Sequence, residues 1–356
     1  MKRIPLLHRK ILWIPLGIAA LLLIWDRLLS SEKIRPYTET GAEYYFYNMK
    51  DKVLSTMKKE TDSKTEAQKV LTFFGTSHMG EFSLEEFEKE SPGLIVYNLS
   101  GPSAPYSFHN FTLEKLLSRK IPLDYAILEY YPDSGTDFAN RYPLRYSYDF
   151  PFFLRYWNIF STNEWDSFLK AKVFRTSVFP PRFKEAFSRI KNPSEVQQLV
   201  FIRDILINES DKFKGGIPNG LLANTPEDKL GSESERIFNE SYKNFKSSKV
   251  QEYFLRNFLN TARENHIKVV LWTPLLYSTF SEKVRSAPFF QEWIDLRNKL
   301  IQEYPETLVL DMEDYRSRMK CQKFIDPHHL SGGCYAEPTI FLVEFLQEKG
   351  NLPKTK

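Results

Sequence analysis

The sequence predicts an α/β fold in which a parallel sheet of about five strands forms the middle layer of a three-layer sandwich, with a large helical insertion. Short apolar, β-branched runs alternate along the chain with longer helical patterns, which is the order of a parallel sheet with crossover helices. The 356 residues are enough to bury a large core. We expect strands at residues 70–74, 94–97, 124–129, 267–272 and 307–310, and helices at residues 107–119, 249–265, 287–303 and 332–349.

The first expected strand ends at a glycine and is followed by a helix-start signal. Residues 70–74 read Val-Leu-Thr-Phe-Phe, an apolar run typical of a buried strand. Gly75 then permits a sharp turn. Ser83 precedes Glu86 by three residues, the capping-box spacing in which each side chain satisfies the other's backbone N–H, so a helix should begin there.

The alternation stops between residues 136 and 245, which we interpret as an insertion between the two parts of an α/β domain, 70–135 and 246–356. The stretch 142–160 is rich in Tyr, Phe and Trp. These aromatics most often build core, and a surface for sugar rings, an acyl chain or the membrane interface is the alternative. The Gly-, Pro- and Ser-rich stretch 215–234 predicts a mobile loop that could cover a site as a lid.

The N-terminus has the pattern of a membrane anchor. Basic residues precede the apolar stretch 11–25, which reaches Leu29, a helix length of about 28 Å, if Asp26 and Arg27 snorkel. We expect residues 1–30 to be an uncleaved single-pass anchor in the inner membrane, 31–69 a stalk that is partly helical, and the rest of the chain to be exported to the periplasm. A cleaved signal peptide is the competing interpretation.

The charge balance argues against nucleic acid as a partner. Lys and Arg number 49 against 45 Asp and Glu, a net charge of +4 without a dominant basic tract outside the N-terminus. The chain also shows no internal repeat, phosphate-binding loop or dinucleotide-binding glycine pattern.

Two separated segments carry the residue types of a nucleophilic triad. Ser77 follows the first expected strand, at the edge where ligands bind in open α/β sheets. Asp326 and His329 lie before the last helix, at a spacing that lets the carboxylate hold one imidazole nitrogen while the other faces a serine. The plainer interpretation makes Ser77 a cap or turn residue. His78 and His328 could replace His329 as base, bind substrate, or be ordinary loop imidazoles.

These segments resemble the SGNH (GDSL-like) hydrolase superfamily, whose first and last blocks are similar to Gly75-Thr76-Ser77-His78 and Asp326-Pro327-His328-His329. The resemblance implies an SGNH or flavodoxin-like fold, with Ser77 as nucleophile, His329 as general base and Asp326 as its partner. It further implies that the backbone N–H groups of Ser77 and Gly101 form the oxyanion hole.

One family block departs from the pattern. Where the family places an asparagine that completes the oxyanion hole, this chain reads Tyr130-Tyr131-Pro132-Asp133-Ser134-Gly135. Glu129, Tyr131 and Asp133 are the residues we expect at the pocket instead, although a carboxylate would oppose an oxyanion.

The order of blocks and the predicted anchor are most similar to envelope members of the superfamily, namely DltD-like and alginate-acetylation-like proteins and related spirochaete envelope proteins. This similarity implies an esterase or O-acyltransferase acting on acyl esters of envelope glycans or polymers, with a membrane acyltransferase as a potential partner. The mechanism requires neither a metal nor an organic cofactor. The alternative is a catalytically inactive binding or assembly protein of the envelope.

Two cysteines flank the expected base and its carboxylate. Cys321 and Cys334 could form a disulfide across this loop in an oxidising compartment, and two free thiols are the alternative.

Overall fold

The computed structural model describes residues 6–31, 33–38, 43–136, 140–197, 200, 214–216 and 224–354. The chain divides into two compact units. We call Met1–Tyr44 with Leu144–Ile205 the helical unit, and Tyr45–Pro143 with Leu206–Lys356 the sheet unit.

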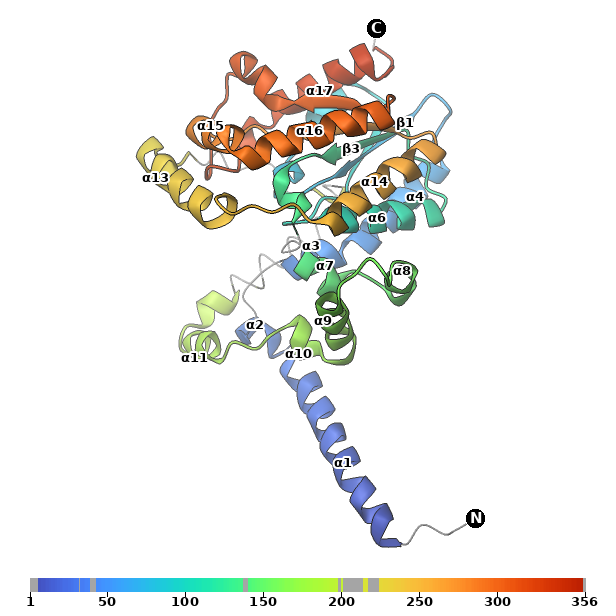
Figure 1. Ribbon diagram of the computed structural model, residues 1–356, viewed down its shortest axis with the longest axis vertical. Coiled ribbons are helices and arrows are strands. Elements are labelled where there is room, and N and C mark those ends of the chain that lie inside the picture. Colours follow the sequence, from blue (N-terminus) through green and yellow to red (C-terminus); the bar gives the residue numbers. More distant parts are fainter. Residues whose placement is uncertain are drawn as a thin grey trace. The chain divides into compact units, whose positions relative to one another are not determined.

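A five-stranded parallel sheet with the order β2-β1-β3-β4-β5 forms the centre of the sheet unit. Figure 1 shows β1 and β3 among the helices of this unit. This flavodoxin-like order confirms the predicted fold class. Each predicted strand agrees with the observed one to within one residue at either end. The strands are β1 (Lys69–Phe74), β2 (Leu94–Asn98), β3 (Tyr125–Glu129), β4 (Lys268–Thr273) and β5 (Leu308–Asp311).

Helices cover both faces of this sheet and complete the three layers (Figure 1). One face carries α4 (Lys50–Asp62), α6 (Tyr106–Ser118), α14 (Lys249–Glu264) and α16 (Pro288–Glu303). The other carries α5 (Leu84–Glu90) and α17 (Ala336–Lys349), which pack against each other. Shorter elements connect them: η1 (Ser77–Met79), η2 (Pro132–Gly135), α15 (Ser278–Ser286), η5 (Met312–Arg318) and η6 (Gly332–Cys334).

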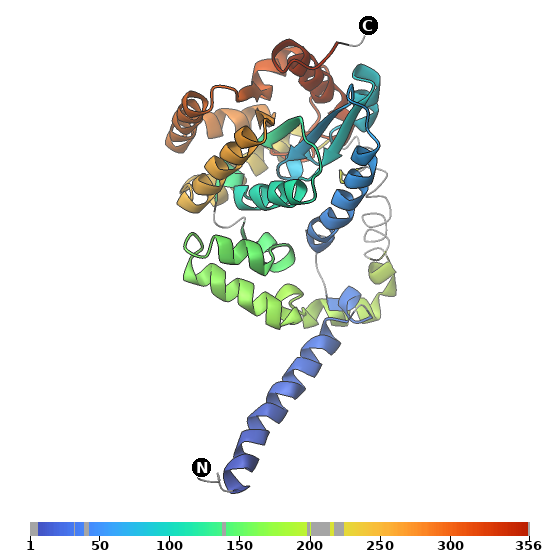
Figure 2. The ribbon, with the colours of Figure 1, turned by 90° about the vertical axis from the view of Figure 1, so that its right-hand side faces the viewer.

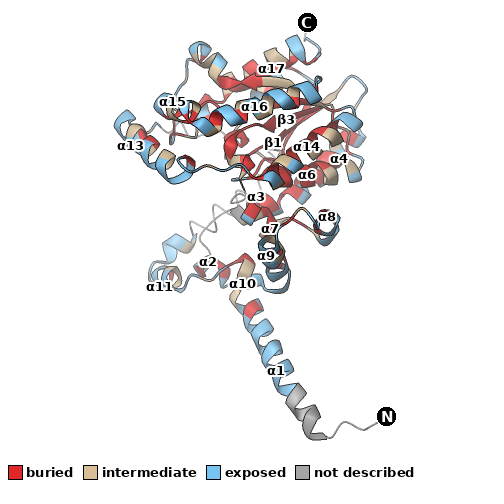
Figure 3. Ribbon diagram, in the orientation of Figure 1, coloured by how far each residue is buried: buried red, intermediate tan, exposed pale blue. Residues whose placement is uncertain are grey.

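Neighbouring residues of β1 show how the two helical layers are anchored. The ring of Phe73 lies 4.4 Å from that of Phe82, in the core shared with α5 and α17. The ring of Phe74 lies 5.1 Å from that of Phe258 of α14, on the opposite face. Because successive strand side chains point to opposite faces, a strand covered on both sides needs an unbroken apolar run. Figure 3 shows the strands mostly buried, and the residues of intermediate exposure lie at the start of β1, β4 and β5.

The helix start predicted at Ser83 is confirmed, because its side chain accepts a hydrogen bond from the Glu86 N–H at 3.3 Å. The last predicted helix, 332–349, begins as η6 and becomes α-helical at Ala336.

Much of the stalk predicted at residues 31–69 is folded into the sheet unit instead. Residues from Tyr45 onward belong to the sheet unit. Here α3 (Glu43–Asn48) leads into α4, which packs on β2 and buries Val53, Leu54 and Met57. These apolar residues recur at helical spacing, so a helix that buries them against the sheet is more stable than an extended linker that would leave them exposed to water.

The helical unit begins with α1 (Leu6–Leu29), one continuous helix (Figure 2). Its further helices are α2 (Arg35–Thr38), α8 (Phe150–Arg155), α9 (Thr162–Val173), α10 (Arg175–Val178) and α11 (Phe183–Lys191), while α7 (Arg141–Tyr146) crosses the boundary between the units. Most aromatics of residues 148–160 are buried, as in the stacked rings of Phe153, Phe160 and Phe168. This part of the insertion is therefore mainly core, with Phe150 and Trp157 exposed.

The carboxylate of Asp26 binds within the helical unit. It accepts the backbone N–H groups of Arg175 and Thr176, at 2.9 and 2.8 Å, and so caps α10. Asp26 therefore does not snorkel as we expected. None of the helices described here combines the length and the apolar character needed to cross a bilayer.

The expected loop at 215–234 is partly helical. Residues Glu227–Ile237 form α13, which buries Leu230 and Ser234 and continues into the π-helical turn η4 (Phe238–Tyr242). Gly215 lies beside β2, where its carbonyl accepts a hydrogen bond from the Lys50 ammonium at 3.0 Å. Residues 217–223 of the predicted lid lie outside the described residues.

Candidate active site

The candidate site lies at the carboxyl ends of β1 and β3. These strands are neighbours in the sheet. The chain leaves β1 for α5 on one face, and the connection from β2 to β3 runs through α6 on the other. Such a switch of faces opens a crevice at the carboxyl ends of the strands, where ligands bind in open α/β sheets. Ser77 lies three residues after the end of β1 and begins η1.

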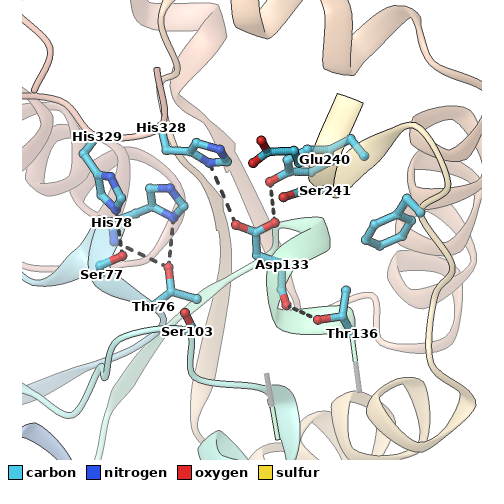
Figure 4. A pocket seen from close by; sticks show the side chains of 12 residues that line it. Thr76, Ser77, His78, Ser103, Asp133, Thr136, Glu240, Ser241, His328 and His329 are labelled. Atoms are coloured by element: carbon cyan, nitrogen blue, oxygen red, sulfur yellow. Dashed lines mark hydrogen bonds and ion pairs between the residues drawn. The ribbon is translucent and has the colours of Figure 1, made fainter. Parts of the chain in front are cut away.

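The structure brings Ser77, His329 and Asp326 together. Figure 4 shows Ser77 beside His329. The Ser77 Oγ lies 2.7 Å from the His329 Nε2. The His329 Nδ1 lies 2.9 Å from each carboxylate oxygen of Asp326. With the Nδ1 proton on the Asp326 side, the Nε2 lone pair is left to accept the serine proton. This is the hydrogen-bond order that serine nucleophiles require.

The loop that carries Asp326 and His329 is held by its own hydrogen bonds. The Asp326 Oδ1 accepts the backbone N–H groups of His328 and His329, at 2.8 and 3.0 Å. The Ile325 N–H donates to the His329 carbonyl at 2.9 Å. A disulfide joins Cys321 and Cys334, so of the two alternatives for these cysteines, a disulfide or two free thiols, the structure has the disulfide. The base is therefore positioned by a closed loop rather than by a helix or strand.

The Asp326 carboxylate is ionised in this setting. Burial disfavours its charge, but the His329 imidazole and the two backbone donors more than offset burial and hold the pKa of Asp326 well below its usual value. An ionised Asp326 keeps the His329 ring in one orientation and one tautomer.

A cavity of about 500 Å³ opens beside Ser77 and His329. Of the residues predicted for the pocket, His78, Asp133 and His328 line it. Tyr131 and Glu129 do not line it, and both are buried, with exposed fractions of 1% and 0%. The wall also includes Thr76, Ser103, Thr136, Glu240, Ser241, Tyr242 and Phe245 (Figure 4).

Glu129 lies behind the cavity wall and binds the first segment from below. Its carboxylate accepts the Thr76 N–H at 2.6 Å and the Thr76 hydroxyl at 2.9 Å, and it lies 2.7 Å from the His78 Nδ1. We expected a carboxylate here to oppose an oxyanion. Its charge is instead neutralised within the protein, because it is paired with His78.

The Glu129–His78 contact is a buried ion pair. Burial disfavours the imidazolium, but the adjacent Glu129 carboxylate outweighs burial and raises the pKa of His78. Burial likewise disfavours the carboxylate, but the charge and hydrogen bond of His78 lower the pKa of Glu129. Both directions favour the charged forms of the pair, and therefore an imidazolium at His78 next to Ser77.

Gly75 is needed for space rather than for a special turn. A Cβ at this position would lie 2.6 Å from the Glu129 Oε2 and 2.5 Å from the Met79 sulfur. The absence of a side chain therefore lets the turn approach β3 closely enough for Thr76 to reach Glu129.

The expected role of Gly101 is wrong. Its N–H donates to the Gly75 carbonyl at 2.9 Å, so it is not available to an oxyanion. The Ser77 N–H has no acceptor among the described residues and remains a candidate donor. Ser103 lines the cavity with a positive φ of 51° and was missed; the Gly101-Pro102-Ser103 turn sequence was the available signal.

The opposite wall of the cavity comes from the insertion. The Tyr242 hydroxyl donates to the Asp133 carboxylate, whose other oxygen lies 3.9 Å from the His328 Nδ1. Burial raises the pKa of Asp133, and burial with the neighbouring histidines lowers the pKa of His328 to about 3, so this imidazole is neutral. No sequence signal pointed to Tyr242, because its approach to Asp133 depends on the path of the insertion.

The site places an imidazole base beside a hydroxyl nucleophile. Within the described ranges, no group of three or more His, Cys, Asp and Glu side chains is arranged to hold a metal ion. The arrangement can transfer the Ser77 proton to His329 while the serine oxygen attacks an electrophilic carbon.

Comparison with known proteins identifies a family. No curated protein matches the chain. A family model described as protein of unknown function (DUF1574) matches residues 6–346. The matched range contains Ser77, Asp326 and His329 and leaves out only the ends of the chain. The protein therefore belongs to the DUF1574 family.

Proposed function

We propose that this protein is a serine-dependent acyl-ester enzyme of the cell envelope, either an esterase or an O-acyltransferase. The observation that carries the proposal is the unbroken chain of hydrogen bonds from Ser77 through His329 to Asp326. Ser77 is separated from Asp326 and His329 by about 250 positions in the sequence, yet the three residues meet with the distances and the order that activate a serine.

The reaction proceeds in two halves. The Ser77 Oγ forms a bond to the acyl carbon while its proton moves to the His329 Nε2, and the carbonyl electron pair moves onto the oxygen. The Ser77 N–H donates to that oxyanion. The ester C–O bond then breaks, and the leaving alcohol takes the proton from His329. Water or another hydroxyl repeats the sequence in reverse and releases the acyl group from Ser77.

The cavity favours a polyhydroxylated substrate. Hydroxyl and carboxylate groups from Thr136, Glu240 and Ser241 line it beside the ring of Phe245. Hydroxyls and carboxylates bind sugar hydroxyl groups, and an aromatic face packs on the C–H surface of a sugar ring. This composition supports an acyl ester of a glycan or polymer, with a glycan hydroxyl as the acceptor in a transfer reaction.

The disulfide and the N-terminal sequence support an envelope location. Disulfides persist in oxidising compartments such as the periplasm. The basic residues before the apolar stretch 11–25 favour an anchor in the inner membrane with the remainder exported. Resistance of the cell-associated protein to extraction by alkaline carbonate would support the anchor, whereas full release into the soluble fraction would contradict it.

A fluorophosphonate probe tests the catalytic proposal on the full chain in detergent. The probe labels serines that an adjacent base activates, so the wild-type protein should be labelled at Ser77 and the Ser77→Ala variant should not. Ser103→Ala is a useful comparison, because it changes another serine of the same cavity without touching the nucleophile. Wild-type protein that remains unlabelled, or labelling that persists in Ser77→Ala, would overturn the proposal.

One observation favours the second candidate, an inactive binding or assembly protein with the same fold. The Gly101 N–H already donates to the Gly75 carbonyl, and no asparagine directly follows β3. Two of the oxyanion donors typical of the superfamily are therefore lacking. Under this candidate, the probe would leave Ser77 unmodified while acetylated glycan fragments still bind the cavity, measured by calorimetry.

A further inference from the structure

The two units differ in how they treat large apolar side chains. In the described part of the sheet unit, only Tyr253 and Ile325 are large apolar residues with exposed fractions above one third, at 40% and 37%. The helical unit exposes many more, along α1 and on α8, α9 and α11 (Figure 3). Contiguous exposed apolar surface on a folded protein indicates an interaction site.

The exposed face of α11 is a continuous stripe. Phe183, Phe187 and Ile190 are exposed by 57%, 69% and 63%. Their spacing of four and then three residues places them on one side of the helix. Lys184 and Lys191 are also exposed, and at 100° per residue both fall along the same border of the stripe.

Contacts on the other side of α11 hold this stripe outward. The guanidinium of Arg189 donates to the carbonyls of Pro36 and Tyr37, at 3.2 and 3.1 Å. The Arg182 N–H donates to the Thr38 carbonyl at 3.3 Å. These bonds tie α11 to α2, so its apolar side is the one that faces away from the unit.

The same contacts place α11 near the end of α1. Only residues 30–34 separate α1 from α2. Asp26, in the last turn of α1, caps α10, which lies just before α11 in the chain. If α1 ends at a membrane surface, α11 is therefore close enough to contact the same surface.

We propose that the stripe of Phe183, Phe187 and Ile190 lies in the headgroup region of an anionic lipid bilayer, as an interfacial helix beside the end of α1. Two features favour lipid over a second copy of the chain or another protein. First, α1 exposes large apolar residues almost continuously from Trp13 to Leu28, a surface that lipid covers and water does not. Second, residues 144–197 carry nine Lys and Arg against five Asp and Glu, which complements negative headgroups.

The consequence is an orientation of the helical unit. An interfacial helix with an apolar stripe and a lysine border lies parallel to the membrane, with its apolar residues about 5–10 Å below the headgroups. The helical unit would then be fixed to the bilayer at two places, along α1 and along α11. A single anchor would leave it free to tilt.

Site-specific fluorescence tests this proposal on the full chain. Both native cysteines are in the disulfide and no free cysteine is present among the described residues, so one introduced cysteine can be labelled selectively. We would attach an environment-sensitive nitrobenzoxadiazole dye to Phe187→Cys and reconstitute the protein in phosphatidylcholine vesicles with phosphatidylglycerol. Matched control sites are Ser188→Cys, the exposed neighbour on the same helix, and Ser232→Cys on α13 of the sheet unit.

The proposal predicts a blue-shifted emission at position 187 and at least twofold quenching by lipids brominated near the headgroup. Position 188 should be quenched less and position 232 should remain unquenched. Equal, weak quenching at all three sites of vesicle-bound protein would overturn the proposal. Shielding at 187 that disappears when the protein is diluted among vesicles would assign the stripe to a second copy, which also overturns it. The outcome is independent of labelling at Ser77, so it does not depend on the proposed catalytic function.

Discussion

Two histidine–carboxylate pairs lie side by side at the end of β1, and they use similar groups for different ends. His329 pairs with Asp326 and contacts the Ser77 hydroxyl, whereas His78 pairs with Glu129, which also binds the Thr76 hydroxyl. Their rings are nearly parallel, with centroids 4.9 Å apart. The His329 side chain is 32% exposed, and that of His78 is 2% exposed.

Burial and the second ring nitrogen explain the difference. The His329 Nε2 faces a hydroxyl in the cavity, so this ring can take up a proton and release it. The His78 Nε2 is buried without a partner among the described residues, and its ring is held as a cation by Glu129. One pair is therefore arranged for proton transfer, and the other fixes a charge and a turn. A histidine beside a carboxylate is therefore not by itself a catalytic base.

The largest expected effect is a loss of catalytic rate when the carboxylate of the His329–Asp326 pair is replaced. Asp326→Asn should keep the loop, because an amide oxygen can still accept the two backbone N–H groups, but it should lower kcat by about 10⁴-fold through loss of the imidazole tautomer and charge. Its free energy of unfolding should change by less than about 1 kcal/mol, because a third of this side chain is exposed. Hydrolysis of p-nitrophenyl acetate and urea denaturation measure the two. A large loss of stability with little loss of rate would mean that Asp326 supports the fold rather than proton transfer.

The second effect is a loss of folding stability when the carboxylate of the His78–Glu129 pair is replaced. Glu129→Ala leaves the buried His78 cation and the Thr76 N–H without their acceptor, so we expect a loss of about 3–5 kcal/mol in the free energy of unfolding. Glu129→Gln should lose less, because its amide oxygen still accepts from Thr76. Urea denaturation of the three proteins checks this order. Equal stability of Glu129→Ala and wild type would mean that the pair does not support the turn.

The third effect concerns the closed loop that carries His329. Replacing both Cys321 and Cys334 by serine should cost about 3 kcal/mol of stability, since the disulfide closes a loop of 13 residues. It should also lower the rate of fluorophosphonate labelling, while leaving His78 and Glu129 in place. Intact mass before and after alkylation should show no free thiol in wild-type protein purified without reductant. Two alkylated thiols would contradict the disulfide itself.

The smallest effect is the pH dependence of the stability that the His78–Glu129 pair contributes. The pKa of His78 is raised from 6.5, so its contribution to stability is complete below pH 6.5 and is lost as the pH rises through the raised pKa. The pKa of Glu129 is lowered from 4.5, so its contribution is complete above pH 4.5 and is lost as the pH falls through the lowered pKa.

The stability difference between wild type and His78→Asn should therefore be largest between pH 4.5 and 6.5 and should shrink at higher pH. The change cannot exceed about 1.4 kcal/mol per pH unit, the limit for one proton. Urea midpoints across this range measure it. His266→Asn, an exposed histidine with a positive φ of 57° that asparagine also adopts, is the matched control and should follow wild type. A difference that does not vary with pH would mean that His78 is neutral.

Local patterns were sufficient for the parallel sheet and for part of the site. The five strands are apolar runs between polar turns, and such runs fold the same way wherever both sheet faces are covered. Ser77, Asp326 and His329 were predictable because each follows a strand or precedes a helix, and the carboxyl ends of parallel strands share one edge. The role expected of Gly101 was wrong because it depended on one backbone hydrogen bond, to Gly75, that sequence spacing does not reveal.

The strands, the chain order of Ser77, Asp326 and His329, and the spacing that lets Asp326 hold His329 could all be predicted, because these features depend on neighbours along the chain. Only the tertiary structure decided that Glu129 pairs with His78 behind the cavity and that Tyr242 closes the opposite wall. It also placed residues 45–62 against the sheet. These outcomes depend on which distant groups meet, because the charge of His78 is favoured by the Glu129 carboxylate against the effect of burial, whereas His328, buried without so close a carboxylate, is neutral.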